Sequence, residues 1–217
     1  MKKLLLLIPA ILLFSGAKAQ VNKDITKAKQ ILDAVALQTK SYATIEIEFT
    51  YSMADAKKKI NESKKGTASM KGEKYLLDFA GQNIISDGKT TWTYIKDANE
   101  VQINTVNAND DQSMNPAKLL TSYDKSFTPK FIKEETKNGK VLQIIDLTPL
   151  KGRSYFKIRM EIDKNLKQIY DAIVYDKNGT TVYTYTVNKF TTTKQIADTK
   201  FTFKASDHPG VEVTDLR

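Results

Sequence analysis

The sequence is short of the residue types on which many enzymes and metal proteins depend. Its 217 residues include no cysteine, one histidine and one tryptophan. Without cysteine the chain forms no disulfide and no thiolate metal site, and it cannot carry the lipid that a bacterial lipoprotein bears on its first mature residue. Packing alone must therefore stabilise the domain. This is feasible because a chain of ~150 residues already buries about 70% of its unfolded surface.

The single histidine argues against several catalytic classes. His208 lies in the turn-like stretch 206–210, and its immediate neighbours cannot assemble a Ser-His-Asp triad, whose members converge from separate positions. A histidine-rich zinc site is excluded, and residues 109–111 lack the spacing and the glycine of a calcium loop. The sequence predicts a protein that is not an enzyme and holds no metal or cofactor. An envelope hydrolase with a glycosidase-like carboxylate pair stays open as an alternative.

The charge balance is basic, and lysine supplies it. The net charge of +9 falls to +6 when Lys2, Lys3 and Lys18 leave with an N-terminal leader. Nucleic-acid readers rely on the planar fork of arginine, which is scarce here, so no nucleic-acid partner is predicted. Lysines cluster only at 57–59 and 64–65. We expect a hydrated surface; the alternative is attraction to anionic lipid head groups or to an acidic partner.

The N-terminus has the three parts of a secretory signal. Lys2 and Lys3 precede the apolar run 4–14, and residues 17–19 read Ala-Lys-Ala, with small residues at positions −3 and −1 of a cleavage site. The run is shorter than the ~20 residues that cross a bilayer. We predict that residues 1–19 are cleaved, that residues 20–217 form one domain, and that this domain is a soluble protein of the periplasm.

Hydrophobic periodicity predicts a helix followed by many strands. Apolar residues three and four apart mark a helix over 25–35, and strict alternation marks a strand over 44–53. Residues 155–163 alternate Phe156, Ile158, Met160 and Ile162 with charged residues. Asn-Gly and Asp-Gly pairs supply hairpin turns. Further strands are expected at 67–71, 74–80, 83–85, 90–95, 100–105, 130–134, 141–148, 168–176, 180–190 and 200–203.

One short helix is expected between the strands. Asn115 as N-cap and Pro116 at the first helical position begin it, and Leu119 and Leu120 can be buried only against the sheet. About ten antiparallel strands form a sheet that usually curls. The predicted fold is therefore α+β and mainly β: a curved antiparallel sheet forming a half-open barrel, covered by an N-terminal helix and a short central lid helix.

Large apolar side chains recur with one parity on successive predicted strands. For any single residue an ordinary packed core is the simpler explanation. Taken together, the residues predict a concave face wider than the helices can fill, with an apolar cavity worth about 0.8 kcal/mol per buried methylene. The candidate cavity residues are Phe49, Tyr51, Leu77, Phe79, Trp92, Tyr94, Ile103, Leu119 and Leu120.

Two stretches resemble the LolA family of periplasmic outer-membrane lipoprotein carriers. They are ISDGKTTWTY at 85–94, and FTF at 201–203 followed by PGVEV at 209–213 and DLR at 215–217. The resemblance covers nearly the whole mature chain. It implies a half-open barrel whose cavity binds the acyl chains of lipoproteins, an inner-membrane ABC transporter as donor, an outer-membrane acceptor, and transient contact with membrane surfaces.

One departure concerns the lid that the resemblance implies. Many family members carry an Arg-Pro pair before the strand at 75–80, and that arginine bonds the lid backbone. Here residues 71–74 read Lys-Gly-Glu-Lys, so Lys74 is the candidate substitute, although an ammonium lacks the planar fork. Two further functions stay open beside the carrier: a binding module of the same shape for another lipid, and a regulator that senses mislocalised lipoproteins.

Overall fold

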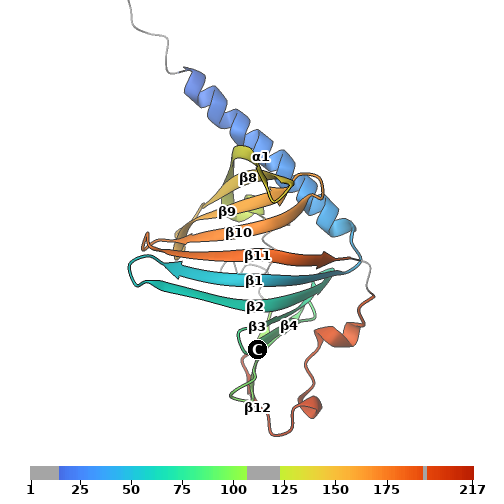
Figure 1. The fold of residues 1–217 in the computed structure, drawn as a ribbon. Helices are drawn as coiled ribbons and strands as arrows, with labels where there is room; N and C mark the ends of the chain where they lie inside the picture. The colour runs from blue at the N-terminus through green and yellow to red at the C-terminus, as the bar shows by residue number, and fades with distance from the viewer. Residues whose placement is uncertain (1–14, 107–122, 193–194) are drawn as a thin grey trace, which may run out of the picture.

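Residues 15–106, 123–192 and 195–217 are described by a computed structural model, drawn in Figure 1. Among them one sheet of twelve strands accounts for most of the chain. The helical elements are α1 (Ser15–Ser41), α3 (Tyr123–Ser126), η1 (Asp198–Phe201) and η2 (Ala205–Asp207). The strands are β1 (Ile45–Asp55), β2 (Ile60–Lys71), β3 (Lys74–Phe79), β4 (Gln82–Ser86), β5 (Thr90–Ile95), β6 (Glu100–Thr105), β7 (Phe127–Lys137), β8 (Lys140–Pro149), β9 (Tyr155–Asp163), β10 (Gln168–Asp176), β11 (Thr181–Thr191) and β12 (Glu212–Asp215).

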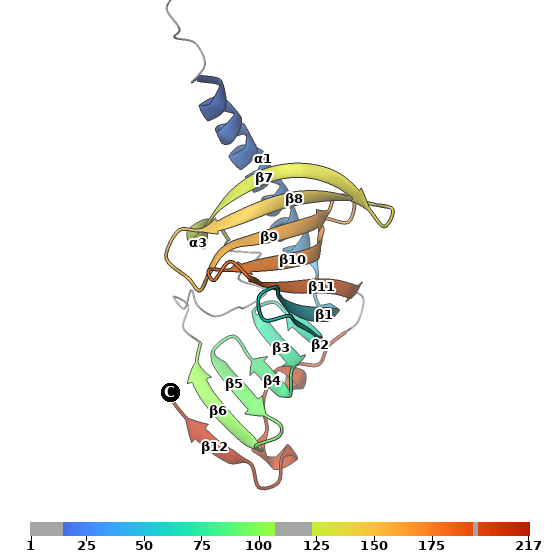
Figure 2. The same cartoon turned by 60° about the vertical axis from the view of Figure 1, so that its left-hand side comes forward.

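The sheet is assembled mainly from hairpins. Its strand order is β12-β6-β5-β4-β3-β2-β1-β11-β10-β9-β8-β7. Strands joined by tight turns are antiparallel neighbours, and β1 pairs with β11 where the two halves of the sheet meet. Strand β12 adds to β6 in parallel. The edge strands β7 and β12 lie at opposite ends of the curved sheet, which stays open (Figure 2). The predicted mainly β, half-open fold is confirmed.

Three local predictions differ from the structure. Strand β2 begins at Ile60 rather than at residue 67, because main-chain pairing with β1 continues through the seven residues 60–66, which lack apolar alternation. The predicted strand at 200–203 is wrong: its first half lies in η1, where Phe201 is buried, and Phe203 packs on Tyr94 of β5. Strand β12 was not predicted, since only the main chain of β6 gives its residues an extended partner.

Helix α1 covers one part of the sheet. It begins at Ser15, inside the predicted signal peptide, and buries Ala28, Leu32 and Val35 in the main hydrophobic core. Tyr123 of α3 ties this helix down, because its hydroxyl donates to Asp33 Oδ1 at 2.8 Å. No helix in the described ranges has the length and apolarity that a membrane crossing needs. The predicted lid helix at 115–120, with Leu119 and Leu120, lies outside the described residues.

Strand registers define two faces of the sheet. Residues directly opposite one another on neighbouring strands point to the same side. The row Tyr51, Tyr185, Ala172, Met160, Ile145 therefore shares a face, and most of this row belongs to the core that packs against α1. We call this side the helix face and the other side the outer face.

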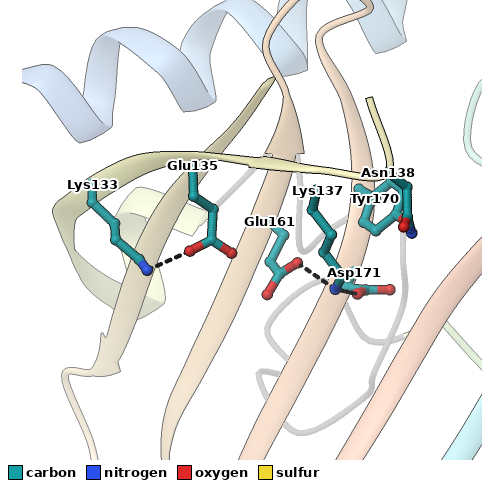
Figure 3. A network of polar contacts seen from close by, with 7 residues as sticks. All are labelled: Lys133, Glu135, Lys137, Asn138, Glu161, Tyr170 and Asp171. Carbon is teal, nitrogen blue, oxygen red and sulfur yellow. Dashed lines mark hydrogen bonds and ion pairs between the residues drawn. The ribbon is translucent and has the colours of Figure 1, made fainter. Parts of the chain in front are cut away.

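The outer face of β7–β10 carries an ion-pair network (Figure 3). Lys137 Nζ lies 2.9 Å from Asp171 Oδ2 and 3.1 Å from Glu161 Oε2, and both carboxylates are buried. Hydrogen bonding to Asp171 and Glu161 raises the pKa of Lys137. Beside it, Lys133 pairs with Glu135, on the side of β7 away from α1. Because Glu161 and Asp171 both pair with Lys137, they do not form the acid–base pair that a glycosidase requires.

Phe156 departs from the predicted alternation of β9. Tyr175 pairs with Lys157 while Asp176 pairs with Tyr155, so Phe156 has no cross-strand partner. This bulge turns its ring away from the core residues Ile158 and Met160. The ring is 47% exposed and lies 6.0 Å from the ring of Tyr175. The prediction that Phe156 shares a face with Ile158 is therefore wrong.

Asp55 holds the turn between β1 and β2 and makes stability depend on pH. Thr181 Oγ1 donates to Asp55 Oδ2 at 2.7 Å, and the amides of Lys57 and Lys58 donate to Oδ1 at 3.0 Å. The Thr181 bond, followed by the amide bonds, lowers the pKa of Asp55 below its ordinary value. A carboxylate with a lowered pKa stabilises the fold above its unfolded pKa, about 3.9, and this stabilisation is lost as the pH falls through the folded value.

We therefore expect Asp55→Asn to lower Tm at neutral pH by several degrees and to flatten the fall of Tm between about pH 5 and pH 2. The measurement is thermal unfolding across a pH series. Asp207→Asn, at an exposed carboxylate, is the control and should leave the profile unchanged. Parallel profiles for Asp55→Asn and the wild type would refute this role of Asp55.

Candidate functional site

Five aromatic rings form a continuous platform on the helix face. The ring of Tyr51 lies 5.3 Å from those of Phe79 and Tyr185 and 6.2 Å from that of Tyr183. Phe49 joins them at 5.6 Å from Phe79 and 6.3 Å from Tyr185. We call these five residues the aromatic platform. It joins β11, β1 and β3, so it bridges the two halves of the sheet.

Gly66 explains how the platform crosses β2. This glycine stands opposite Phe49 on one side and Phe79 on the other. A Cβ at this position would overlap the ring of Phe49, so only glycine allows the ring to lie across the strand. Sequence reasoning did not single out Gly66, Tyr183 or Tyr185. The two tyrosines have the right parity within β11, but their pairing with β1 was not apparent.

Leu77 extends the platform toward the other end of the sheet. It lies between Ala68 of β2 and Ile84 of β4 on the same face, two residues before Phe79. Both Leu77 and Ile84 are half-buried among the described residues. The predicted site residues Phe49, Tyr51, Leu77 and Phe79 are thus brought together on one face.

Trp92, Tyr94 and Ile103 lie on the outer face instead. Ile84, which shares the face of Leu77, stands opposite Thr93, so the neighbouring Trp92 points to the other side. Trp92 in turn stands opposite Ile103. The predicted set is therefore divided between two faces. Alternation shows which residues of one strand share a face. The turn between two strands then decides which face of the next strand lies on the same side of the sheet.

The C-terminal segment packs on the outer face at Tyr94. The ring of His208 lies 4.3 Å from that of Tyr94 and stacks on Phe203 at 4.7 Å with an interplanar angle of 9°. Lys71 and Lys74 both bond Asp198, at 2.7 and 3.0 Å. Lys74, the candidate substitute for the family arginine, therefore contacts the C-terminal segment. His208 has a packing role here.

Tyr51 and Tyr185 of the aromatic platform are uncharged at neutral pH. Burial raises the pKa of Tyr185 to about 12, and burial together with Tyr183 and Glu62 raises the pKa of Tyr51. Their hydroxyls therefore stay protonated and can donate hydrogen bonds. Within the described ranges no group of three or more His, Asp or Glu side chains is placed to hold a metal ion. The surface offers apolar contact and neutral donors, which suits hydrocarbon bearing ester or amide groups.

The sequence of the chain matches a known protein family. The sequence model described as outer membrane lipoprotein carrier protein LolA matches residues 40–204, which is well over half of the chain. The chain belongs to the LolA family. The match includes the whole aromatic platform and ends before β12. A comparison with curated protein sequences gives no match.

Several solved structures resemble this chain at low sequence identity. An uncharacterized conserved protein from Thermus thermophilus has a TM-score of 0.59 and 11% identity, covering 87% of this chain and 99% of that chain. A DUF1329 family protein from Desulfovibrio piger has a TM-score of 0.48 and 13% identity, covering 82% and 98%. A LolA superfamily protein from Nitrosomonas europaea has a TM-score of 0.44 and 12% identity, covering 81% and 97%. At 11% identity the likeness to the Thermus thermophilus protein concerns the fold alone.

Proposed function

We propose that this LolA-family protein is a periplasmic carrier that holds the acyl chains of lipoproteins on the helix face and moves them from the inner to the outer membrane. An inner-membrane ABC transporter would load it, and an acceptor in the outer membrane would unload it. Removal of residues 1–19 from a chain without cysteine would leave the carrier free to move between the two membranes.

The aromatic platform is the observation that carries this proposal. Phe79 and Tyr51 contact through their rings, Leu77 continues the apolar surface, and Gly66 removes the side chain that would interrupt it. Covering about ten methylenes at ~0.8 kcal/mol each would supply about 8 kcal/mol. Part of that is spent on immobilising the cargo. The remaining binding free energy suits a complex that forms readily and still releases its cargo.

The test has two stages. First, native mass spectrometry of protein purified from its envelope without detergent should show a bound acylated species that organic extraction removes. Second, the delipidated protein should release a triacylated lipoprotein from inner-membrane vesicles into the soluble fraction. Protein that takes up no acylated lipoprotein in either stage would contradict the proposal.

The first stage also separates the alternatives. A free phospholipid or another small lipid in place of acylated protein would indicate a binding module for that lipid. Stable binding of acylated protein without any transfer to outer-membrane vesicles would indicate a sensor of lipoproteins.

A further inference from the structure

Three loops and the α3–β7 junction lie side by side at one end of the sheet. The amide of Ala56 donates to the carbonyl of Thr180, and the amide of Lys177 donates to that of Ser154. The amide of Leu150 donates to the carbonyl of Ser126 in α3. These bonds join the β1–β2, β10–β11 and β8–β9 loops and the α3–β7 junction into one surface, which we call the loop end.

The loop end is basic. Its exposed lysines are Lys57, Lys58, Lys59, Lys125, Lys151 and Lys177. Asp55, Glu62, Asp124 and Asp176 offset four of these six charges and Arg153 adds one, so the loop end keeps a net positive charge. Among the described residues none of the six ammonium groups forms an ion pair. At the opposite end Lys137, Lys140 and Lys164 are all neutralised by carboxylates. The six lysines of the loop end therefore differ from these three, which have carboxylate partners.

Two large apolar side chains project from this basic surface. Leu150 is 58% exposed, and Phe156, turned outward by the bulge in β9, is 47% exposed. Lys157 Nζ lies 4.2 Å above the ring of Tyr175, which packs beside Phe156. Apolar tips among unpaired lysines match the head-group region of an anionic bilayer, where the hydrocarbon side chains enter and the ammonium groups meet lipid phosphates.

We propose that the loop end docks on the surface of an anionic phospholipid bilayer. Docking there would bring the aromatic platform close to the membrane, because Tyr183 is two residues from Thr181 at the loop end. The ring of Tyr51 stacks on that of Tyr183 at 6.2 Å. The surface differs from the cargo site. Vesicle binding and acyl binding can therefore fail independently.

The test is co-sedimentation of the exported protein with vesicles of phosphatidylglycerol and phosphatidylcholine, compared with pure phosphatidylcholine. Binding should require phosphatidylglycerol and weaken as salt is raised. Each lysine near an anionic surface contributes about fivefold, so Lys57→Gln/Lys58→Gln/Lys59→Gln should lower partitioning at least about tenfold. The charge-matched control, Lys23→Gln/Lys29→Gln/Lys40→Gln on exposed positions of α1, should change it by less than about threefold.

A second pair of variants tests the exposed apolar side chains Leu150 and Phe156. Leu150→Ser/Phe156→Ser should lower partitioning to a similar degree, whereas Leu37→Ser/Leu166→Ser, at positions 73% and 51% exposed elsewhere, should not. All four variants change exposed side chains, and thermal unfolding checks their folding. Equal effects in the loop-end and control variants would overturn the proposal. An absence of vesicle binding would also overturn it. If the protein bound an acidic polypeptide but no vesicles, the loop end would be a site for a protein partner.

Discussion

Leu77→Glu is expected to lower the affinity for a fluorescent acyl probe by at least about tenfold, which corresponds to about 1.4 kcal/mol. The substitution places a carboxylate between Ala68 and Ile84, next to the aromatic platform. Acyl chains that cover this position would desolvate the charge without giving it a hydrogen-bond donor, and that cost exceeds the lost apolar contact. Because Leu77 is only half-buried, the free protein can keep the new carboxylate in contact with water.

Titration of the delipidated protein with the probe measures this effect. Leu77→Met conserves volume and apolarity and should bind within about twofold of the wild type. Trp92→Phe, on the outer face, should do the same. If Trp92→Phe lost the probe while Leu77→Glu kept it, the cargo site would lie on the outer face.

Phe201→Ala is expected to lower the free energy of unfolding by about 3–5 kcal/mol. Phe201 is fully buried, although it belongs to the short η1 segment outside the sheet. Its removal leaves a cavity beneath a segment whose ion pairs, such as Lys71–Asp198, are exposed and contribute little.

Urea unfolding followed by far-UV circular dichroism tests this expectation, with Asp198→Asn as the comparison. Asp198→Asn removes the partner of Lys71 and Lys74 and should cost less than about 1 kcal/mol. Acyl binding by folded Phe201→Ala should remain, because the helix face is unchanged. A loss below about 1 kcal/mol for Phe201→Ala would show that the C-terminal segment is not needed to stabilise the sheet.

Helices and strands could be predicted where their own apolar residues repeat with a helical or a strand period. The apolar stripe of α1 and the alternation in β1 follow from apolar side chains that face one side of their own element. Strands β2 and β12 were only partly predicted or not predicted, because their extended form depends on main-chain pairing with β1 and β6. That pairing leaves no mark on their own side chains.

The sequence predicted which aromatic and apolar residues group together within a strand, but not the face of the sheet on which each group lies. Alternation grouped Leu77 and Phe79 within β3, and Trp92 and Tyr94 within β5, but the turn geometry between β3, β4 and β5 places the two pairs on opposite sides. The role of Gly66 was also hidden, since a glycine in a strand has no apolar signal. Its significance comes from the ring of Phe49 lying across it.

Contact quenching by a brominated acyl chain tests the central claim most directly, namely that the cargo lies on the helix face. Trp92 is the only tryptophan, and it reports on the outer face. A Trp92→Phe/Tyr51→Trp variant moves the reporter into the aromatic platform. We expect the brominated chain to quench the emission of this variant strongly and to leave the emission of Trp92 in the wild-type protein unchanged. Quenching of Trp92 without quenching at position 51 would contradict the assignment of the site.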